Sequence, residues 1–422
     1  MNELTLMFTI IVGLLVIGVP IGVSLGIGVV GALWWADESM MFFTQKLFNN
    51  FDSFPLLAIP FFLLSGDIMA RGTLADTLLN FCRSMLGHRK AGMAYITIVT
   101  CLFYGALCGS AVATTAAVGA TMIPAMEKEG YPKSFATAVN ASSGALGIII
   151  PPSIPMILYG AFGGVSVSNM FLAGIIPGCF VALMLMVTAG FICAKNHYGN
   201  VLPKASARER WASFREAKWA LGVPVIILGG IYGGITTPTE AGVVAVVYSF
   251  IVEKFIRKSM TMAVFRKIMV DSATTLGLIM LVLVTANALG NIMMLANIQD
   301  SLLHWVQSLT TSPHVLTAVL LIMLFILGMF VEVSAIILIF APLLVPIVTS
   351  YGIDPVHFGI AFIVSMCLGG LTPPVGVNLF IGCSISGLNI AILTKAILPF
   401  IGAIIAANFI LAYVPFLSLC LL

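Results

Sequence analysis

Two stretches in which paired prolines interrupt apolar sequence decide the fold: residues 140–160 read NASSGALGIIIPPSIPMILYG, and residues 367–384 read CLGGLTPPVGVNLFIGCS. A proline inside a helix lacks the N–H of the backbone ladder and its ring clashes with a preceding carbonyl, so two in succession open the helix. In hydrocarbon, opened peptide groups are costly unless a ligand, water or a polar cavity receives them. The two stretches therefore predict two broken membrane helices beside a polar site.

The two stretches are mates in an internal repeat. Sliding the sequence on itself by 222 residues aligns residues 124–177 with residues 346–399 without a gap, and ten of the 54 positions are identical. Seven of the ten are Gly or Pro, where composition alone predicts fewer than about one match. An ordinary pair of proline kinks is the alternative interpretation, since membrane helices tolerate them. The seven pairs are Pro124/Pro346, Gly130/Gly352, Gly147/Gly369, Pro151/Pro373, Pro152/Pro374, Gly160/Gly382 and Pro177/Pro399.

The composition predicts that the lipid bilayer surrounds nearly the whole chain. Of the 422 residues, 60% are hydrophobic and 8% are charged, against about a quarter charged in an ordinary soluble domain. The net charge of +3 is small, and no basic cluster is interleaved with aromatic residues, which argues against a nucleic-acid partner. The eight cysteines lie in or beside apolar segments without the spacing of a metal site or a disulfide framework.

The distribution of basic residues predicts the orientation. Lysine and arginine gather in residues 71–90, 195–218 and 254–267, which the positive-inside rule places in the cytoplasm. The base-poor loops 36–53, 163–168, 298–313 and 350–354 are expected outside, as are both termini. Lys128 and Lys133 mark one loop of the repeat as cytoplasmic, whereas the matching loop has Asp354 and no base. The repeat is therefore expected to be inverted, as in many secondary transporters.

Each half is predicted to hold five crossings and a re-entrant hairpin. Two short passes fold at a proline (residues 4–35 around Pro20; residues 219–252 around Pro238), and a third pass follows (54–70; 270–297). A hairpin (91–126; 314–348) and two further passes complete each half. The predicted fold class is an all-α polytopic membrane protein with an inverted repeat, two re-entrant helical hairpins and two broken helices. The predicted units are scaffold helices in 1–90 and 219–313, transport-domain halves in 91–194 and 314–422, and a cytoplasmic connection in 195–218, where residues 205–220 read as an amphipathic interfacial helix.

Small and hydroxylated residues at the hairpin tips point to ion and anion chemistry. Carbonyl and hydroxyl oxygens at half-helix C-termini suit Na⁺, and half-helix N-termini offer N–H groups to a carboxylate. Close packing with Ser/Thr back-bonding is the alternative for any single residue. The substrate candidates are Ser110, Thr114, Asn140, Ser143, Glu332, Ser334 and Asn378.

Four acids fall within or at the ends of apolar segments, where an unpaired charge is expensive. They are Asp67, Glu240, Asp271 and Glu332. Glu332 sits at the second hairpin tip, where it either helps to place a cation or hydrogen-bonds the tip backbone. Glu240 follows Pro238 at a turn and is predicted to be a structural helix cap.

Five motifs carry a family resemblance: GIIIPPSIPMILYG (147–160), GGLTPPVGVNLF (369–380), ITTPTEAGVVAVVY (235–248), YGIDPVHFG (351–359) and IPFFLLSGDIM (59–69). Together they resemble, over essentially the whole chain, the large membrane subunit of tripartite ATP-independent periplasmic (TRAP) transporters of the dicarboxylate and sialic acid type. The resemblance implies a Na⁺-coupled elevator in a bacterial inner membrane. It also implies two partners: a small four-helix membrane subunit, and a soluble periplasmic binding protein that delivers the organic acid. The small subunit is expected to be a separate polypeptide, because the chain begins directly at its first membrane pass.

The resemblance also implies at least two Na⁺ sites between the hairpin tips and the breaks. By this resemblance, the residues that bind Na⁺ in the second half are expected to be Gly328, Gly369, Thr372 and Val375. The repeat offset then predicts Ala106, Gly147, Ile150 and Ser153 for the other site. Because Ile150 replaces Thr372, a side-chain hydroxyl in the first half must come from elsewhere, such as Ser110 or Ser153.

Three other functions are alternatives to this interpretation. A membrane-embedded enzyme is disfavoured because the five histidines are scattered over loops and segment ends. A channel is disfavoured because paired hairpins around a midplane site favour alternating access. The closest alternative is a stand-alone Na⁺/dicarboxylate- or citrate-type transporter that needs no binding protein. The expected substrate is a small organic acid anion of the sialic acid or C4-dicarboxylate class.

Overall fold

The computed structural model describes the whole chain except residues 1–2, 37–40, 42–53, 202 and 297. The described part is helical and contains no strand, which confirms the all-α class. Within it, four helices are long and apolar enough to cross a membrane, or six if each of two bent helix pairs counts as one span.

The predicted scaffold segments form helices that pack on one another across the two halves. α12 packs on α4, α13 packs on α2 and α4, and α11 packs on α5 and α12. The first half contributes α1 (Glu3–Val16), α2 (Ile21–Trp35), η2 (Phe54–Leu57), α4 (Ala58–Arg71) and α5 (Leu74–Leu86). The second contributes α11 (Ala207–Tyr232), α12 (Pro238–Ile251), η4 (Val252–Ile256), α13 (Met262–Leu295) and α14 (Ile298–Leu309).

The remaining helices form the two hairpins and the two broken helices. The first half has α6 (Gly92–Cys108), α7 (Ala111–Lys128), α8 (Lys133–Gly144), η3 (Ala145–Ile148), α9 (Ile154–Phe162) and α10 (Val167–Asn196). The second has α15 (Pro313–Gly328), α16 (Val333–Ser350), α17 (Pro355–Gly369), α18 (Val377–Ser386), α19 (Ile390–Tyr413) and α20 (Phe416–Leu419). α16 begins and ends 222 residues after α7. The structure thus confirms the repeat, the hairpins and both breaks.

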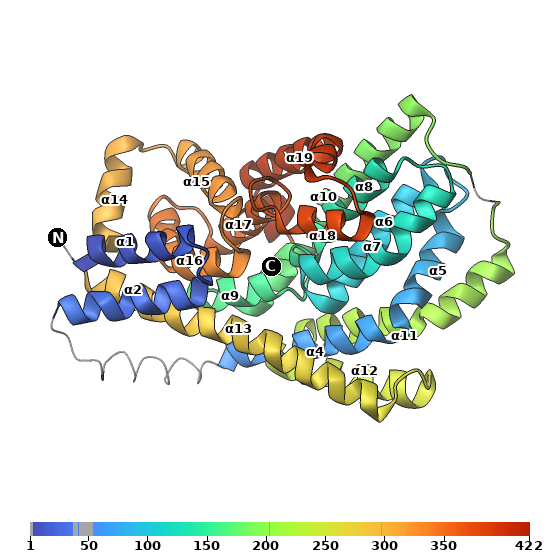
Figure 1. Ribbon diagram of the computed structural model, residues 1–422, viewed down its shortest axis with the longest axis horizontal. Helices are drawn as coiled ribbons and strands as arrows, with labels where there is room; N and C mark the ends of the chain where they lie inside the picture. The colour runs from blue at the N-terminus through green and yellow to red at the C-terminus, as the bar shows by residue number, and fades with distance from the viewer. Residues whose placement is uncertain (1–2, 37–40, 42–53, 202, 297) are drawn as a thin grey trace.

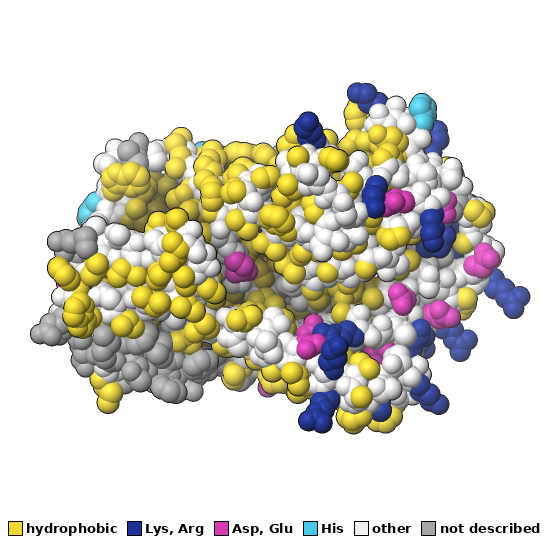
Figure 2. All heavy atoms as spheres, viewed as in Figure 1, with side chains coloured by type: hydrophobic (Ala, Val, Ile, Leu, Met, Phe, Trp, Pro, Cys, Tyr) yellow, Lys and Arg dark blue, Asp and Glu magenta, His cyan; other side chains and the backbone are white. Residues whose placement is uncertain are grey.

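The two hairpins enter the molecule from opposite ends. Figure 1 shows α6 and α7 in the right half of the view and α15 and α16 in the left half, so that their tips point toward the middle. The C-terminal helices then interlock the halves, because α18 packs on α7 and α8, and α19 packs on α8 and α10. Among the described residues, Lys and Arg gather over the right half of the face in Figure 2.

Three predictions about connecting segments were wrong or fall outside the described residues. The loop expected at 298–313 is mostly the helix α14. The interfacial helix expected at 205–220 is not separate, because α11 runs unbroken from Ala207 to Tyr232. The loop expected at 36–53 lies almost entirely outside the described residues. α5 and α14 were not predicted as separate helices, because their apolar residues form one stripe along the helix and not a continuous apolar run.

Candidate substrate and ion site

The two hairpin tips cap their second helices with different residues at the same repeat position. In the first tip, Gly109 has a left-handed backbone (φ +62°), and the Ser110 hydroxyl accepts a hydrogen bond from the Ala113 N–H at 3.4 Å. In the second tip, the Glu332 carboxylate accepts hydrogen bonds from the Ser334 N–H at 2.8 Å and the Ala335 N–H at 3.3 Å. One tip therefore ends on a neutral hydroxyl and the other on a carboxylate.

Each tip is hydrogen-bonded to the broken helix of its own half. The Ile154 N–H, after the first break, donates to the Gly109 carbonyl at 3.3 Å. The Val375 N–H, inside the second break, donates to the Met329 carbonyl at 3.1 Å. The opened backbone is thus partly satisfied by the neighbouring tip, as buried peptide groups require.

Glycine is required where each tip meets its break. A Cβ on Gly369 would lie 2.3 Å from the carbonyl carbon of Gly328, and one on Gly147 would lie 2.6 Å from the Ser110 carbonyl oxygen. Gly328 and Gly369, two of the predicted Na⁺ ligands, are therefore in direct backbone contact. In the first half, a Cβ added to Gly105, the residue before the predicted Ala106, would lie 2.7 Å from the Gly147 Cα.

The predicted hydroxyl ligands both lie beside a break, at different repeat positions. The Thr372 hydroxyl donates to the Leu368 carbonyl at 2.8 Å, and the Ser153 hydroxyl donates to the Ile148 carbonyl at 2.7 Å. Each hydroxyl oxygen keeps a lone pair for a cation. Their surroundings differ, since Ile150 and Ser153 are buried whereas Val375 is 41% exposed.

A cavity of about 400 Å³ lies where the tips and breaks meet α2, α4 and α13. Its polar lining includes the predicted residues Ser110, Glu332, Ser334 and Asn378, together with Thr275 of α13, which the sequence analysis missed. The buried side chain of Asn378 makes no hydrogen bond to any described residue. Apolar walls come from α2, α4 and α13 through Ile21, Leu63, Leu278, Ile279 and Val282.

The other three substrate candidates do not line this cavity. The Thr114 hydroxyl donates to the Ser110 carbonyl at 2.8 Å, and the Ser143 hydroxyl donates to the Val139 carbonyl at 2.6 Å. The Asn140 amide donates to the Thr115 carbonyl at 2.9 Å and so ties α8 to α7. All three side chains support the helices that hold the tip.

The cavity contains one acidic side chain and, among the described residues, no basic one. Glu332 is the acid, and its carboxylate is already engaged by the first turn of α16. A bound anion would therefore meet hydroxyls, the Asn378 amide and backbone N–H groups.

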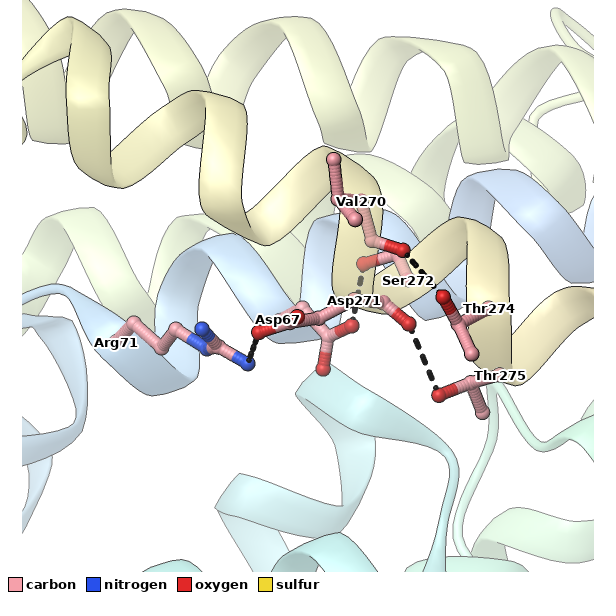
Figure 3. Close-up of polar contacts among 7 residues, drawn as sticks. All are labelled: Asp67, Arg71, Val270, Asp271, Ser272, Thr274 and Thr275. Atoms are coloured by element: carbon pink, nitrogen blue, oxygen red, sulfur yellow. Dashed lines mark hydrogen bonds and ion pairs between the residues drawn. The ribbon is translucent and has the colours of Figure 1, made fainter.

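Beside Thr275 of the cavity lining, polar residues cross-link α4 to α13 (Figure 3). Asp67 accepts a hydrogen bond from Ser272, and Arg71 pairs with Asp271 at 2.6 Å. Thr275, which lines the cavity, donates to the Asp271 carbonyl at 3.1 Å. The predicted acids Asp67 and Asp271 thus have polar partners across α4 and α13, and neither belongs to the cavity lining.

Two further carboxylates cap helices. Glu240 accepts from the Thr237 N–H at 2.7 Å in a capping box, as predicted. Glu253, which the sequence analysis missed, is fully buried and accepts from the N–H groups of Thr73 at 2.9 Å and Leu74 at 3.0 Å. It therefore caps α5 from the second half of the chain.

Comparison with known proteins agrees with this architecture. Residues 8–417 match the family described as "Tripartite ATP-independent periplasmic transporter, DctM component". The chain is 40% identical to the C4-dicarboxylate TRAP transporter large permease protein DctM of Pseudomonas aeruginosa, over 94% of this chain and 93% of that protein. It is 34% identical to the 2,3-diketo-L-gulonate TRAP transporter large permease protein YiaN of Escherichia coli, over 96% of this chain and 95% of that protein.

A third relative is longer than this chain. The isethionate TRAP transporter permease protein DctMQ of Oleidesulfovibrio alaskensis is 39% identical over 95% of this chain, which spans 63% of its length. Among solved structures, the YdaH transporter of Alcanivorax borkumensis has the same fold at a TM-score of 0.63 and 14% identity, over 88% of each chain.

Proposed function

The chain belongs to the DctM family of TRAP transporters, the large permease components, and we propose that it carries a small organic acid anion through the central cavity together with Na⁺. The observation that carries this proposal is the cavity itself, which both hairpin tips and both breaks enclose against the scaffold. Breaks of this kind bind substrate and coupling ions in inverted-repeat transporters.

Na⁺ accounts for the charge in the site. The cavity lining has one carboxylate and no base among the described residues, so an incoming carboxylate needs positive charge from a co-transported ion. Oxygen donors suited to Na⁺ lie at both breaks, through Thr372 and Ser153 and the backbone near Gly369 and Gly147. We propose at least two such sites, one for each half.

The movement proposed is that of an elevator. Residues 91–194 and 314–422 form the moving unit, because their helices interlock across the two halves. Residues 1–90 and 219–313 form the stationary scaffold, and residues 195–218 connect the two. The cavity lies along the boundary between them, since α2, α4 and α13 supply one wall.

The proposed setting is a bacterial inner membrane, with the base-rich end in the cytoplasm and both termini in the periplasm. The proposed partners are a small four-helix membrane subunit and a soluble periplasmic binding protein. The relatives' printed substrates, C4-dicarboxylates, isethionate and diketogulonate, are all small organic acid anions. These, with sialic acid, are the candidates to be assayed.

Uptake into proteoliposomes tests the proposal. We expect uptake of a labelled organic acid to require an inward Na⁺ gradient, the small subunit and the binding protein. Uptake by this chain alone would favour the stand-alone Na⁺/dicarboxylate or citrate type. Uptake that is indifferent to Na⁺ would contradict the coupling.

A further inference from the structure

The central cavity offers few hydrogen-bond donors that are free to meet an anion. Five of its lining side chains carry an oxygen or a nitrogen atom, and they are Ser110, Thr275, Glu332, Ser334 and Asn378. The Thr275 hydroxyl already donates to the Asp271 carbonyl at 3.1 Å, and the Ser334 hydroxyl donates to the Glu332 carboxylate at 2.9 Å. A hydroxyl has a single proton to donate, so neither Thr275 nor Ser334 has one left for a ligand.

Ser110 and Asn378 are the lining side chains whose donors remain free. The Ser110 hydroxyl accepts from the Ala113 N–H, and no described residue accepts its proton. Asn378 is 3% exposed, and its side-chain amide makes no hydrogen bond to any described residue. Both residues line the cavity, so a ligand in the cavity can reach these donors.

Both free donors stand at the N-terminal end of a helix. Ser110 caps α7, Asn378 is the second residue of α18, and α18 packs on α7. The N-terminus of a helix carries partial positive charge, which favours a bound anion. The N-terminus of α16 also reaches the cavity, but the Glu332 carboxylate of the same chain already occupies it. Free donors and free helix ends therefore coincide at Ser110 and Asn378.

The wall that α13 contributes is aliphatic apart from Thr275. Leu278, Ile279 and Val282 follow Thr275 by three, four and seven positions, so that one face of α13 lines the cavity. Aliphatic residues of α2 and α4 extend this wall. A charged group placed beside it would lose hydration without gaining a hydrogen bond, whereas an alkyl group is stabilised there by leaving water.

We propose that the cavity selects an organic acid with one carboxylate and an apolar remainder. Ser110 and Asn378 donate to the carboxylate, and the aliphatic face of α13 contacts the remainder. The second carboxylate of a dicarboxylate would find no free side-chain donor among the described residues, and would lie beside aliphatic groups or the like charge of Glu332. This selection rests on the proposed transport function and narrows its substrate class.

Two acids of matched shape test the selection. Isocaproate is succinate with one carboxylate replaced by an isopropyl group of similar shape. The melting temperature of the purified full chain is recorded in Na⁺ against rising concentrations of each acid, with K⁺ in place of Na⁺ as the reference. The concentration for half-maximal stabilisation should be about 10-fold lower for isocaproate, because the second carboxylate of succinate is unpaired. Equal concentrations, or a lower one for succinate, would overturn the proposal.

A charge placed on the aliphatic wall should shift the preference toward succinate. Ile279→Lys adds an ammonium group to the lining, and its charge-assisted hydrogen bond should lower the succinate concentration about 10-fold. The matched control Thr274→Lys adds the same charge to an exposed residue of α13 that does not belong to the lining. It should change the preference less than about 2-fold. The same preference in Ile279→Lys and Thr274→Lys would show that the α13 wall does not contact the substrate.

Removal of the Asn378 amide tests the carboxylate end. Asn378→Leu keeps a similar volume without a donor and should raise the isocaproate concentration about 10-fold, since a hydrogen bond to a charged group is lost. Asn378→Ser keeps one donor and should lose less. The melting temperature of each variant without acid shows that it is folded. Unchanged isocaproate stabilisation in folded Asn378→Leu would contradict the assignment of Asn378.

Uptake into proteoliposomes separates failure of this selection from failure of the proposed function. Na⁺-driven uptake of succinate in preference to acids with one carboxylate would overturn the selection and leave the transport function standing. If every acid lacked both Na⁺-dependent uptake and Na⁺-dependent stabilisation, the transport function would be wrong and the selection with it.

Discussion

The two hairpin-and-break units share a backbone but differ in charge and exposure. In the first unit Ser110 caps the tip and the break is buried, with Ser153 only 1% exposed. In the second unit Glu332 caps the tip and Val375, in the break, is 41% exposed. The difference teaches that glycine and proline fix the shared geometry, whereas side chains at matched positions assign each half its own chemistry.

The strongest test of this comparison concerns the inversion itself. Lys128 and Ser350 are exposed last residues of α7 and α16 and are mates in the repeat. In a variant from which the exposed Cys179 and Cys420 are removed, Lys128→Cys and Ser350→Cys should react with an impermeant thiol reagent from opposite faces. The effect is all or none, and labelling from one face would refute the inverted repeat.

The next largest effect is expected at the glycine contact of the second unit. Gly369→Ala would place a Cβ against the Gly328 backbone, whereas Gly370→Ala meets its nearest atom at 3.6 Å. Because the backbone of Gly328 cannot shift without disturbing its helix, we expect the contact between tip and break to be destabilised by about 3 kcal/mol. The equilibrium between the docked and the undocked tip should then change by roughly 100-fold.

Thermal melting and uptake measure the effect of Gly369→Ala, with Gly370→Ala as the control. The control should stay close to the parent protein. Similar uptake by the two variants would mean that the tip is not seated on the break during transport.

A smaller effect is expected from substitution of the residues that cap the two hairpin tips, and it separates the role of charge from that of hydrogen bonding. Glu332→Gln keeps an oxygen for the N–H groups of α16 but removes the negative charge from the cavity. If that charge helps to hold Na⁺, the Na⁺ concentration for half-maximal uptake should rise about 5- to 10-fold, equivalent to roughly 1 kcal/mol.

Ser110→Ala removes a neutral cap at the matched position. It should lower stability by roughly 1 kcal/mol and leave the Na⁺ dependence within about 2-fold. Equal Na⁺ shifts in Glu332→Gln and Ser110→Ala would show that the charge of Glu332 has no role in ion binding.

The smallest effect is expected from single hydroxyls. Thr372→Ala should raise the Na⁺ concentration for half-maximal uptake about 3-fold, since one neutral oxygen ligand contributes roughly 0.5–1.5 kcal/mol. Thr372→Ser keeps the hydroxyl and should resemble the parent protein. An unchanged Na⁺ dependence in Thr372→Ala would count against this site.

Much of the fold could be predicted because prolines and glycines act on the backbone next to them. Pro20, Pro238 and the two proline pairs mark turns and breaks that the structure confirms. Glu240 was predicted as a cap because the two members of a capping box are only three positions apart in the sequence. Amphipathic helices were harder to predict from the sequence. The sequence of α14 resembles that of a loop, and the basic start of α11 resembles a separate interfacial helix.

The candidate site was predicted in part. Ser110, Glu332, Ser334 and Asn378 line the cavity, whereas Thr114, Asn140 and Ser143 turn to nearby carbonyls. A small polar residue in a helix can either line a cavity or hydrogen-bond to a backbone carbonyl of its own or a neighbouring helix. The packing of the helices decides which of the two occurs. Thr275 was missed because it lies in α13, a long helix with no break to mark it.

The sequence by itself determined where the helices open and that the opening occurs twice, 222 residues apart, because a proline's missing N–H acts on its own chain. The tertiary structure alone decided that Gly105 packs against Gly147, and that Glu253 caps α5 from 179 residues away. Such contacts depend on how packed helices rotate against one another, and no local pattern along the chain encodes that rotation.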